Sequence, residues 1–187
     1  MSQSRSHTNP TSLPDPRPTD LILAVWAALE AVTDPEIPVV SLRELGILRD
    51  VRQGVEGLEV VITPTYNGCP AMDQMQDDVR AALQTAGLNA RVVTQLAPAW
   101  TTDWMTAVAR DKLRAYGIAP PHTVAATEAG ASVLRFQPRG AKSVQAVACP
   151  QCGSVHTVET SHFGSTACKA LYKCLDCKEP FDYFKPY

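Results

Sequence analysis

Two C-x-x-C pairs near the C-terminus constrain this 187-residue chain more than any other feature. Cys149 and Cys152 form the first pair, Cys174 and Cys177 form the second, and 21 residues separate the pairs. Each pair closes a tight turn that presents two sulfurs to one ion, and four thiolates make a closed tetrahedral site that suits Zn2+. A segment of about 40 residues rarely folds without a bound metal ion or disulfides to stabilise it. The pattern therefore predicts a β-rich zinc ribbon over residues 143–187, with iron as the alternative metal.

Two of the six cysteines, Cys69 and Cys168, lie outside these pairs. Clustered thiols in a chain whose first residues lack an apolar leader favour a cytoplasmic metal-binding protein over a disulfide-bonded one. A tetrahedral four-cysteine site has no place for Cys168 as a fifth ligand. The residues alone do not decide whether Cys168 is a small buried side chain or a functional thiol. His156 and His162 are interpreted as structural or surface residues, because four cysteines already suffice as ligands.

The overall charge and hydropathy exclude two classes of partner. The chain has 17 Lys and Arg against 19 Asp and Glu, which gives a formal charge of −2. A dedicated nucleic-acid binder needs a clustered basic face, and this balance argues against one. A membrane-spanning helix needs about 18 or more consecutive apolar residues, and the sequence contains no such run. We therefore expect neither nucleic-acid nor membrane partners.

The first 142 residues predict a tail, an α/β domain and a linker. Residues 1–18 are rich in Ser, Thr and Pro and predict a disordered tail. A helix is expected from an N-cap at Thr19 until the prolines that follow residue 34. The later elements are expected in the order strand, strand, helix, strand, helix, at residues 47–53, 58–65, 70–86, 90–96 and 102–116.

This αββαβα order defines an α/β (α+β) domain over residues 19–117, which is large enough to bury its own core. The strand–helix–strand step through residues 70–86 predicts a right-handed parallel crossover. Residues 118–142 are rich in Pro, Ala and Thr and predict a linker with one short strand around residues 133–136. A capping-box pattern, Ser41-Leu-Arg-Glu44, predicts a short helical turn.

Cys69 and Asp34 are the candidate functional residues of this domain. Cys69 ends the stretch Thr63-Pro-Thr-Tyr-Asn-Gly-Cys and precedes the expected helix, whose N–H groups and macrodipole stabilise a thiolate. It is either a reactive or metal-binding thiol or an inert buried one, and the residues alone favour neither reading. Asp34 lies in the proline-stiffened loop Asp-Pro-Glu-Ile-Pro. It is positioned either to face the Cys69 loop or to cap its own loop.

These stretches carry a resemblance to known families. Asp34-Pro-Glu-Ile-Pro38, the Leu-Gly-Ile segment at 45–47 and the stretch at 63–70 resemble the MIP18-like (DUF59) family, which is associated with iron–sulfur cluster assembly and delivery. Residues 149–153, 162–174 and 179–184 resemble the D-protein family of the phenylacetyl-CoA ring-1,2-epoxidase system in phenylacetate degradation. Together the resemblances cover residues 20–187.

The resemblance implies a maturation factor for the epoxidase, an accessory component without catalytic activity of its own. In agreement, the sequence lacks the two Glu-x-x-His motifs of a di-iron centre and has no flavin or NAD fingerprint. Cys69 and Asp34 are then the positions that handle a transient iron–sulfur cluster or iron. The implied partners are the epoxidase reductase, the oxygenase and iron–sulfur assembly proteins.

Two questions stay open at this point. One thiolate cannot hold a cluster that needs four protein ligands, so a homodimer, a small thiol or a client must complete the set around Cys69. The alternative function is a structural docking subunit of the epoxidase complex without thiol chemistry. A thiol–disulfide oxidoreductase is the least favoured function, because neither C-x-x-C pair opens a helix in a thioredoxin-like unit.

Overall fold

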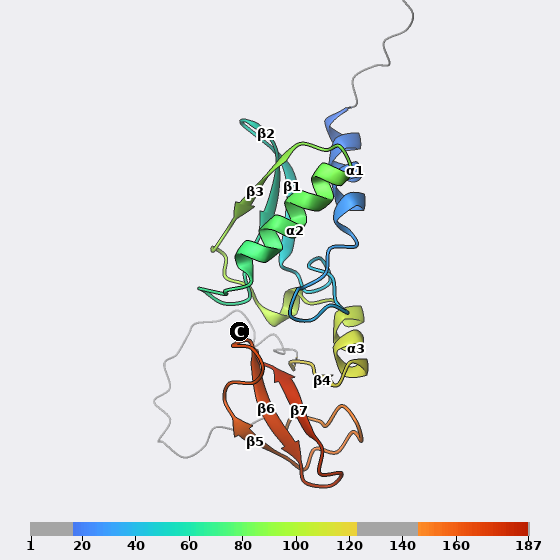
Figure 1. Cartoon of the computed structure of the whole chain (residues 1–187), viewed down its shortest axis with the longest axis vertical. Helices are drawn as coiled ribbons and strands as arrows, with labels where there is room; N and C mark the ends of the chain where they lie inside the picture. Colours follow the sequence, from blue (N-terminus) through green and yellow to red (C-terminus); the bar gives the residue numbers. More distant parts are fainter. Residues whose placement is uncertain (1–16, 123–145, 187) are drawn as a thin grey trace, which may run out of the picture.

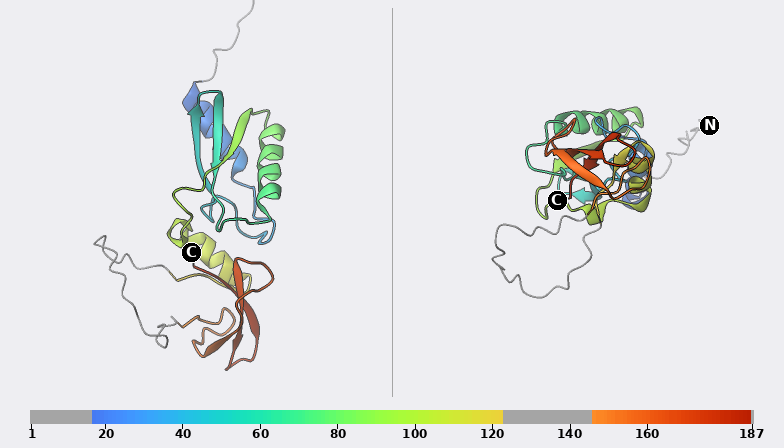
Figure 2. Two further views of the ribbon diagram at one scale, coloured as in Figure 1. Left: turned by 90° about the vertical axis from the view of Figure 1, so that its left-hand side faces the viewer. Right: turned by 90° about the horizontal axis from the view of Figure 1, so that it is seen from below.

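The computed structural model describes residues 17–122 and 146–186. Most of the predicted tail, most of the predicted linker and the expected strand around 133–136 lie outside these residues. The molecule is elongated, with one sheet toward each end, and α3 (Ala107–Ala115) lies where the two halves meet (Figures 1 and 2). We call residues 17–117 the N-terminal half and the sheet with the C-x-x-C pairs the ribbon.

The N-terminal half confirms the predicted αββαβα order. Its elements before α3 are α1 (Pro18–Leu29), β1 (Leu48–Gly54), β2 (Gly57–Ile62), α2 (Met72–Thr85), β3 (Ala90–Thr94) and the short 3-10 helix η1 (Thr102–Trp104). The strand order is β1-β2-β3, with β1 and β2 antiparallel and β2 and β3 parallel. The parallel pair confirms the predicted crossover through α2, because two parallel neighbours need such a connection.

The core forms where α1 and α2 pack against each other and against the sheet (Figure 2). On α2, Met75, Val79 and Leu83 recur at helical spacing and are all buried. Val25 and Leu29 do the same on α1. The middle strand β2 is buried from its second residue to its last, as its dense apolar sequence predicts.

Three helix starts differ from the sequence expectation. Helix α1 begins at Pro18 with Arg17 as its N-cap, so Thr19 is not the cap. Helix α2 begins at Met72, because residues 69–72 first close a turn in which the Met72 N–H donates to the Cys69 carbonyl at 3.2 Å. The last predicted helix divides into η1 and α3, since Thr106 acts as a new N-cap.

The ribbon contains β4 (Ile118–Ala119), β5 (Thr157–Ser161), β6 (Lys169–Cys174) and β7 (Pro180–Phe184). Their order is β4-β7-β6-β5, with β5, β6 and β7 antiparallel and β4 parallel to β7. Residues 118 and 119, which the sequence pattern assigned to the linker, therefore extend this sheet. The chain passes from α3 directly into β4, so the N-terminal half and the ribbon share an element.

A hydrophobic contact joins the two halves. Phe184 at the end of β7 is 1% exposed and belongs to the same core as α1, α2 and β2. Its ring lies 6.0 Å from that of Trp100, whose indole N–H donates to the Leu45 carbonyl at 3.0 Å. Burying a phenylalanine side chain contributes about 1.5–3 kcal/mol, so this contact fixes the ribbon against the N-terminal half.

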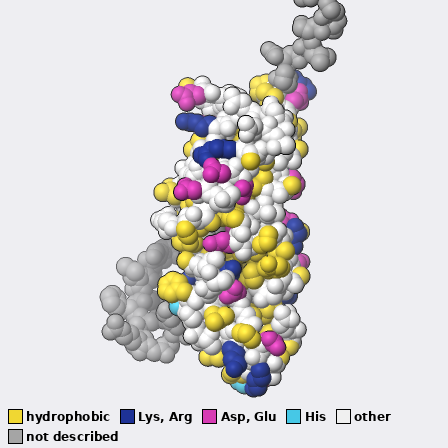
Figure 3. Space-filling model, in the orientation of Figure 1, with side chains coloured by type: hydrophobic (Ala, Val, Ile, Leu, Met, Phe, Trp, Pro, Cys, Tyr) yellow, Lys and Arg dark blue, Asp and Glu magenta, His cyan; other side chains and the backbone are white. Residues whose placement is uncertain are grey.

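The surface carries mixed charges. On the face shown in Figure 3, Lys and Arg side chains are interspersed with Asp and Glu, and hydrophobic side chains gather near the middle of the molecule. No helix within residues 17–122 and 146–186 is long and apolar enough to cross a membrane.

The predicted capping box closes the turn that precedes β1. The Ser41 N–H donates to a carboxylate oxygen of Glu44 at 2.9 Å, and the Glu44 N–H donates to the Ser41 hydroxyl at 3.2 Å. Gly46 ends this turn at φ 74°, and a Cβ built there would lie 2.7 Å from the backbone oxygen of Trp104. The turn thus holds the 3-10 helix η1 at a distance that only glycine permits.

We expect Gly46→Ala to destabilise the protein by more than Gly87→Ala. Gly87 has a similar φ of 67° with nothing within 4 Å of a built Cβ. Alanine there lowers the free energy of unfolding only through its left-handed backbone conformation, by about 1–2 kcal/mol. At Gly46 the contact with Trp104 adds to that cost. Urea unfolding midpoints of the two variants and the wild type measure the difference, and equal midpoints would contradict the packing argument.

Candidate metal centre and thiol seam

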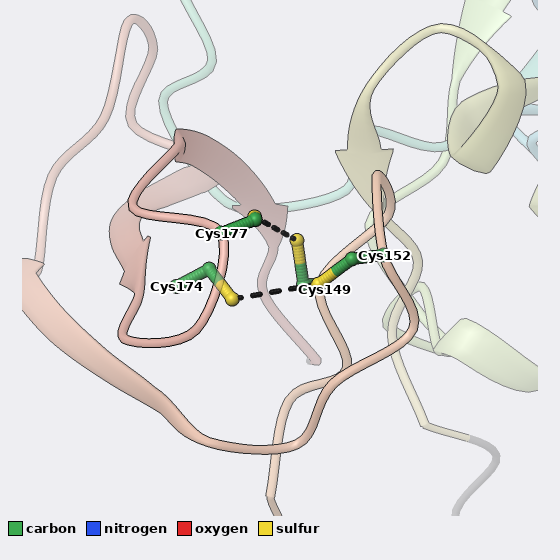
Figure 4. Close-up of side chains that lie close together, drawn as sticks. All are labelled: Cys149, Cys152, Cys174 and Cys177. Atoms are coloured by element: carbon green, nitrogen blue, oxygen red, sulfur yellow. Dashed lines mark hydrogen bonds between the residues drawn. The ribbon is translucent and has the colours of Figure 1, made fainter.

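Four cysteines converge at one end of the ribbon. The sulfurs of Cys149, Cys152, Cys174 and Cys177 all lie within 4.8 Å of one another. Figure 4 shows the first two on one turn and the other two on a second turn that faces it. The Sγ atoms of Cys149 and Cys177 are 3.7 Å apart, and those of Cys152 and Cys174 are 3.6 Å apart. The predicted four-cysteine cluster is thus present as one group.

The backbone of both turns is shaped to present sulfurs. In the first turn the Gly153 N–H donates to the Cys149 carbonyl at 2.9 Å, and Gly153 has φ 74°. In the second turn Lys178 follows the last cysteine at φ 70°, a conformation that is uncommon for a residue with a side chain. Each C-x-x-C pair is therefore followed by one left-handed residue that reverses the chain.

The spacing of the four sulfurs fits a tetrahedral ion. Sulfurs about 2.3 Å from one ion in a regular tetrahedron lie about 3.8 Å apart, close to the two separations given above. Backbone N–H groups of Cys177 and Asp176 lower the pKa of Cys174 to about 6, whereas burial and hydrogen bonds among the thiols raise the pKa of Cys152 and Cys177. The donor set is four sulfurs, which suits zinc or iron and does not suit magnesium or calcium.

His156 lies beside this site without joining it. Its Nδ1 is 3.1 Å from a carboxylate oxygen of Asp176, whose other oxygen accepts a hydrogen bond from the Ser154 hydroxyl. The hydrogen bond from Ser154, followed by that from His156, lowers the pKa of Asp176. The three side chains connect the two cysteine turns from the outside, which agrees with the structural interpretation of His156.

Cys69 lies in the loop between β2 and α2, outside the first turn of the helix. Its thiol is half-buried, and its side chain packs against the core that also contains Cys168 and Phe184. The Tyr66 hydroxyl shares a hydrogen bond with the Cys69 thiol. Burial and then this hydrogen bond raise the pKa of Tyr66, so its hydroxyl keeps its proton and donates.

Asp34 caps its own loop. Its Oδ1 accepts hydrogen bonds from the N–H groups of Glu36 at 2.8 Å and Ile37 at 2.9 Å, and the residue is 6% exposed. Burial raises the pKa of Asp34 against these two hydrogen bonds, which act in the opposite direction. Among the charged groups that influence it is Lys169 of the ribbon. Asp34 therefore lies toward the ribbon, and its hydrogen bonds are to its own loop, which is one of the two roles expected from the sequence.

Cys168 lies between the two halves. It precedes β6, is 6% exposed and belongs to the core of the N-terminal half. Its Sγ lies 3.0 Å from the Thr166 hydroxyl oxygen and 3.8 Å from Glu36 Oε2. Burial raises the pKa of Cys168 to about 11, so the free thiol is protonated at neutral pH. The thiol is buried, as one of the two sequence readings expects, and a functional role for it stays a prediction.

We call Asp34, Glu36, Tyr66, Cys69, Cys168 and Lys169 the seam cluster. Sequence reasoning singled out Asp34, Cys69 and Cys168, and it missed the other members. Glu36 stands between two prolines of the loop already noted, and Tyr66 stands in the stretch that leads to Cys69. Neither carries a pattern of its own, since their role depends on a contact between residues more than 100 positions apart.

Comparisons with known proteins divide the chain in the same way. The model of an iron–sulfur cluster assembly protein family matches residues 23–94, and the model of a PaaD zinc beta ribbon domain matches residues 135–185. The D component of the "Putative 1,2-phenylacetyl-CoA epoxidase" of Escherichia coli (strain K12) is 51% identical over 162 residues, which are 86% of this chain and 90% of that protein. The chain belongs to the epoxidase D-protein family.

Other relatives of this D-protein family member match about half of its length. "Fe-S protein maturation auxiliary factor" of Porphyromonas gingivalis (strain ATCC BAA-308 / W83) is 35% identical over 81 residues, 42% of this chain and 76% of that protein. The "Crystal Structure of Domain of Unknown Function DUF59 from Bacillus anthracis" is 31% identical and covers 50% of this chain and 91% of that chain, with a TM-score of 0.45. The resemblance stated from the motifs is confirmed by the family models and the E. coli relative.

We expect Asp34→Ala to lower the stability of the protein by about 1–3 kcal/mol, because it leaves one buried and one partly buried N–H group without this acceptor. Asp34→Asn keeps an oxygen at the same place and serves as the matched variant. Urea unfolding of both variants between pH 4 and pH 8 checks the expectation.

The pH dependence has a defined sign. Because burial raises the folded-state pKa above 3.8, wild-type Asp34 contributes stability that is fully present below pH 3.8 and is lost as pH rises through the folded pKa. Asn does not titrate, so the stability of Asp34→Asn relative to wild type should increase with pH. A difference that is constant with pH, or an Asn variant as unstable as Ala, would contradict this account.

Proposed function

We propose that this protein is an iron–sulfur maturation factor for the phenylacetyl-CoA epoxidase system and that Cys69 handles the iron or cluster it delivers. One observation carries the proposal: a single chain joins an iron–sulfur assembly domain, with a half-exposed thiol, to the ribbon of the epoxidase D-protein family. The role is that of an accessory component in phenylacetate catabolism, without catalytic activity of its own. Six free cysteines are consistent with a cytoplasmic location.

The clients proposed are the epoxidase reductase and the oxygenase, with iron–sulfur assembly proteins as the source of iron and sulfide. Tyr66 supports a handling role for Cys69, because it places a polar side chain in hydrogen-bond contact with the thiol. Asp34 contributes indirectly, since its hydrogen bonds fix the loop that carries Glu36. A second copy of the chain, a small thiol or the client itself supplies the ligands that complete a transferred cluster.

The metal of the ribbon is proposed to be zinc, with a structural role. Four sulfurs fill a tetrahedron and leave no open position for chemistry. Zinc has no redox chemistry, so it suits a site whose task is to hold two turns together in a small sheet. Iron in the same four-sulfur arrangement is the alternative.

Elemental analysis of anaerobically purified protein should find one zinc per chain. We expect Cys149→Ser to lose this zinc and the amide protection of β5, β6 and β7, because metal-binding energy is folding energy in so small a module. Protection of β1, β2 and β3 should remain in hydrogen-exchange mass spectrometry. A metal-free wild-type chain with a protected ribbon would refute the site, and stoichiometric iron without zinc would assign it to iron.

A structural docking subunit remains the second candidate function. It is favoured by the start of α2 at Met72, which leaves Cys69 outside the first helical turn, and by the commitment of Asp34 to its own loop. The two functions differ in stoichiometry. A docking subunit stays in the purified active complex, whereas a maturation factor is dispensable once the cluster is in place.

The deciding experiment is to produce the epoxidase reductase in cells with wild-type chain, with Cys69→Ser and without the chain. We expect iron and acid-labile sulfide in the purified reductase to be high with wild type and low in the other two cases. Cys69→Ser is nearly isosteric, so its circular dichroism and thermal midpoint should match wild type. Full iron and sulfide with Cys69→Ser would remove the thiol mechanism and leave the docking role as the explanation.

A further inference from the structure

A pocket with a volume of about 390 Å³ lies where the end of α3 meets the first cysteine turn. Gly117 connects α3 to β4, which follow one another beside the ribbon sheet in Figure 1. A Cβ built at Gly117 would lie 3.4 Å from the side-chain amide nitrogen of Gln151, so the cysteine turn packs directly against this connection. The volume is in the range of pockets that take small molecules, roughly 300–1,000 Å³. The pocket is thus a candidate ligand site apart from the seam cluster.

Two arginines and a histidine line this pocket. Arg110 and Arg114 are four positions apart on α3 and therefore lie on one face of the helix, and His122 follows β4. Among the described residues that line the pocket, none is Asp or Glu. Cys149 also lines it, but its sulfur is grouped with those of the other three cysteines. A concave site with two guanidinium groups in its wall favours an anionic ligand.

Two of these side chains have a buried nitrogen without a partner. The Arg110 guanidinium is held in place, since it donates to the Met105 carbonyl at 2.7 Å and to the Thr102 carbonyl at 2.6 Å. Its Nε has no hydrogen-bond partner among the described residues, and neither has Nε2 of His122, whose ring lies 6.3 Å from that of Tyr183. Unpartnered buried polar nitrogens are costly, and the oxygens of an anion in the pocket can satisfy them. Both nitrogens are covered from solvent, so a small rotation of each side chain must accompany this contact.

The other wall of the pocket is apolar and stiff. It is formed by the rings of Pro120, Pro121 and Pro150 and by the Ala148 methyl group. Proline rings have few conformations and present an apolar surface to a ligand. Inorganic phosphate fills only a small part of 390 Å³ and has no apolar group to place on this wall. The pocket therefore favours an anion attached to an organic group.

We propose that this pocket binds a small organic phosphate. The phosphate contacts Arg110, Arg114 and His122, and the organic group lies against the prolines. A guanidinium suits this role, because its planar N–H donors match phosphate oxygens in pairs. Binding is reversible, and no covalent bond forms or breaks. The proposal goes beyond the proposed function and does not depend on Cys69, and the ligand contacts both α3 and the ribbon.

The test titrates phenyl phosphate into the full chain with zinc in the ribbon and follows the backbone amide signals by NMR. We expect saturable shifts centred on residues 110–122 and 148–153, weaker binding of inorganic phosphate, and no binding of phenol. Arg114→Gln should weaken the binding of phenyl phosphate about ten-fold or more, because it removes a charge-assisted contact. His122→Phe keeps a ring at the same place and should also weaken binding. Circular dichroism should show that both variants are folded.

Arg80→Gln is the matched control. Arg80 on α2 pairs with Asp77 at 2.7 Å, as Arg114 pairs with Asp111 at 3.0 Å, and each acid stands three positions earlier on the same helix. The control should bind phenyl phosphate as tightly as wild type, and an equal loss in both arginine variants would mean that only net charge matters and would overturn the proposal.

Three other results would also overturn it. One is the absence of saturable shifts in wild type, and another is inorganic phosphate binding as tightly as phenyl phosphate, which would leave a simple anion site. The third is normal binding by Arg114→Gln together with faster loss of zinc to a chelator, because the arginine would then serve the charge of the zinc thiolates. None of these results bears on the reductase experiment, so the proposed function is tested separately.

Discussion

The packing of Phe184 into the core of the N-terminal half is the contact that fixes the ribbon relative to that half. The ring of Phe184, on the last ribbon strand, lies 6.0 Å from that of Trp100. The parallel pairing of β4 with β7 acts in the same direction, since it ties the end of α3 to the same strand. The ribbon is therefore held in one orientation, and that orientation determines which residues meet where the two halves contact each other.

The seam cluster is a poor choice for stability alone. Asp34, Cys168 and Lys169 are all buried, and burial of charged groups is costly unless they are paired and hydrogen-bonded. Lys169 faces Asp182 at 3.8 Å, and Asp34 satisfies two backbone N–H groups, which offsets part of this cost. Apolar side chains between the two halves would avoid this cost of burial. The thiol and carboxylates of the seam cluster are therefore not explained by packing alone.

Much of the architecture followed from local patterns. The order of helices and strands, the parallel crossover and the four-cysteine group were all predicted, because hydrophobic periodicity and C-x-x-C spacing act over short stretches of chain. Errors fell at element ends. Thr19 was not a cap, α2 started after Pro70, and Thr106 divided a predicted helix, since competing caps and turns differ by only about 1 kcal/mol.

The candidate site was predictable only in part. Cys69 stood out as a cysteine before an expected helix, but its partner Tyr66 had no pattern to distinguish it. Asp34 was open between two roles, and the structure gives it the loop-capping one while also turning it toward the ribbon. Cys168 was equally open, and its burial against Glu36 depends on a contact across 132 positions of sequence.

The sequence by itself determined the order of helices and strands in the N-terminal half and the grouping of four cysteines into two C-x-x-C pairs, because each of these arises from residues that are neighbours in the chain. Only the tertiary structure decided that β4 joins the ribbon, that Phe184 enters the other core and that Cys168 approaches Glu36. These contacts link distant segments, and the burial that drives them is nondirectional. Local pattern therefore specifies which surfaces are apolar, whereas shape and packing select the partner that each surface finds.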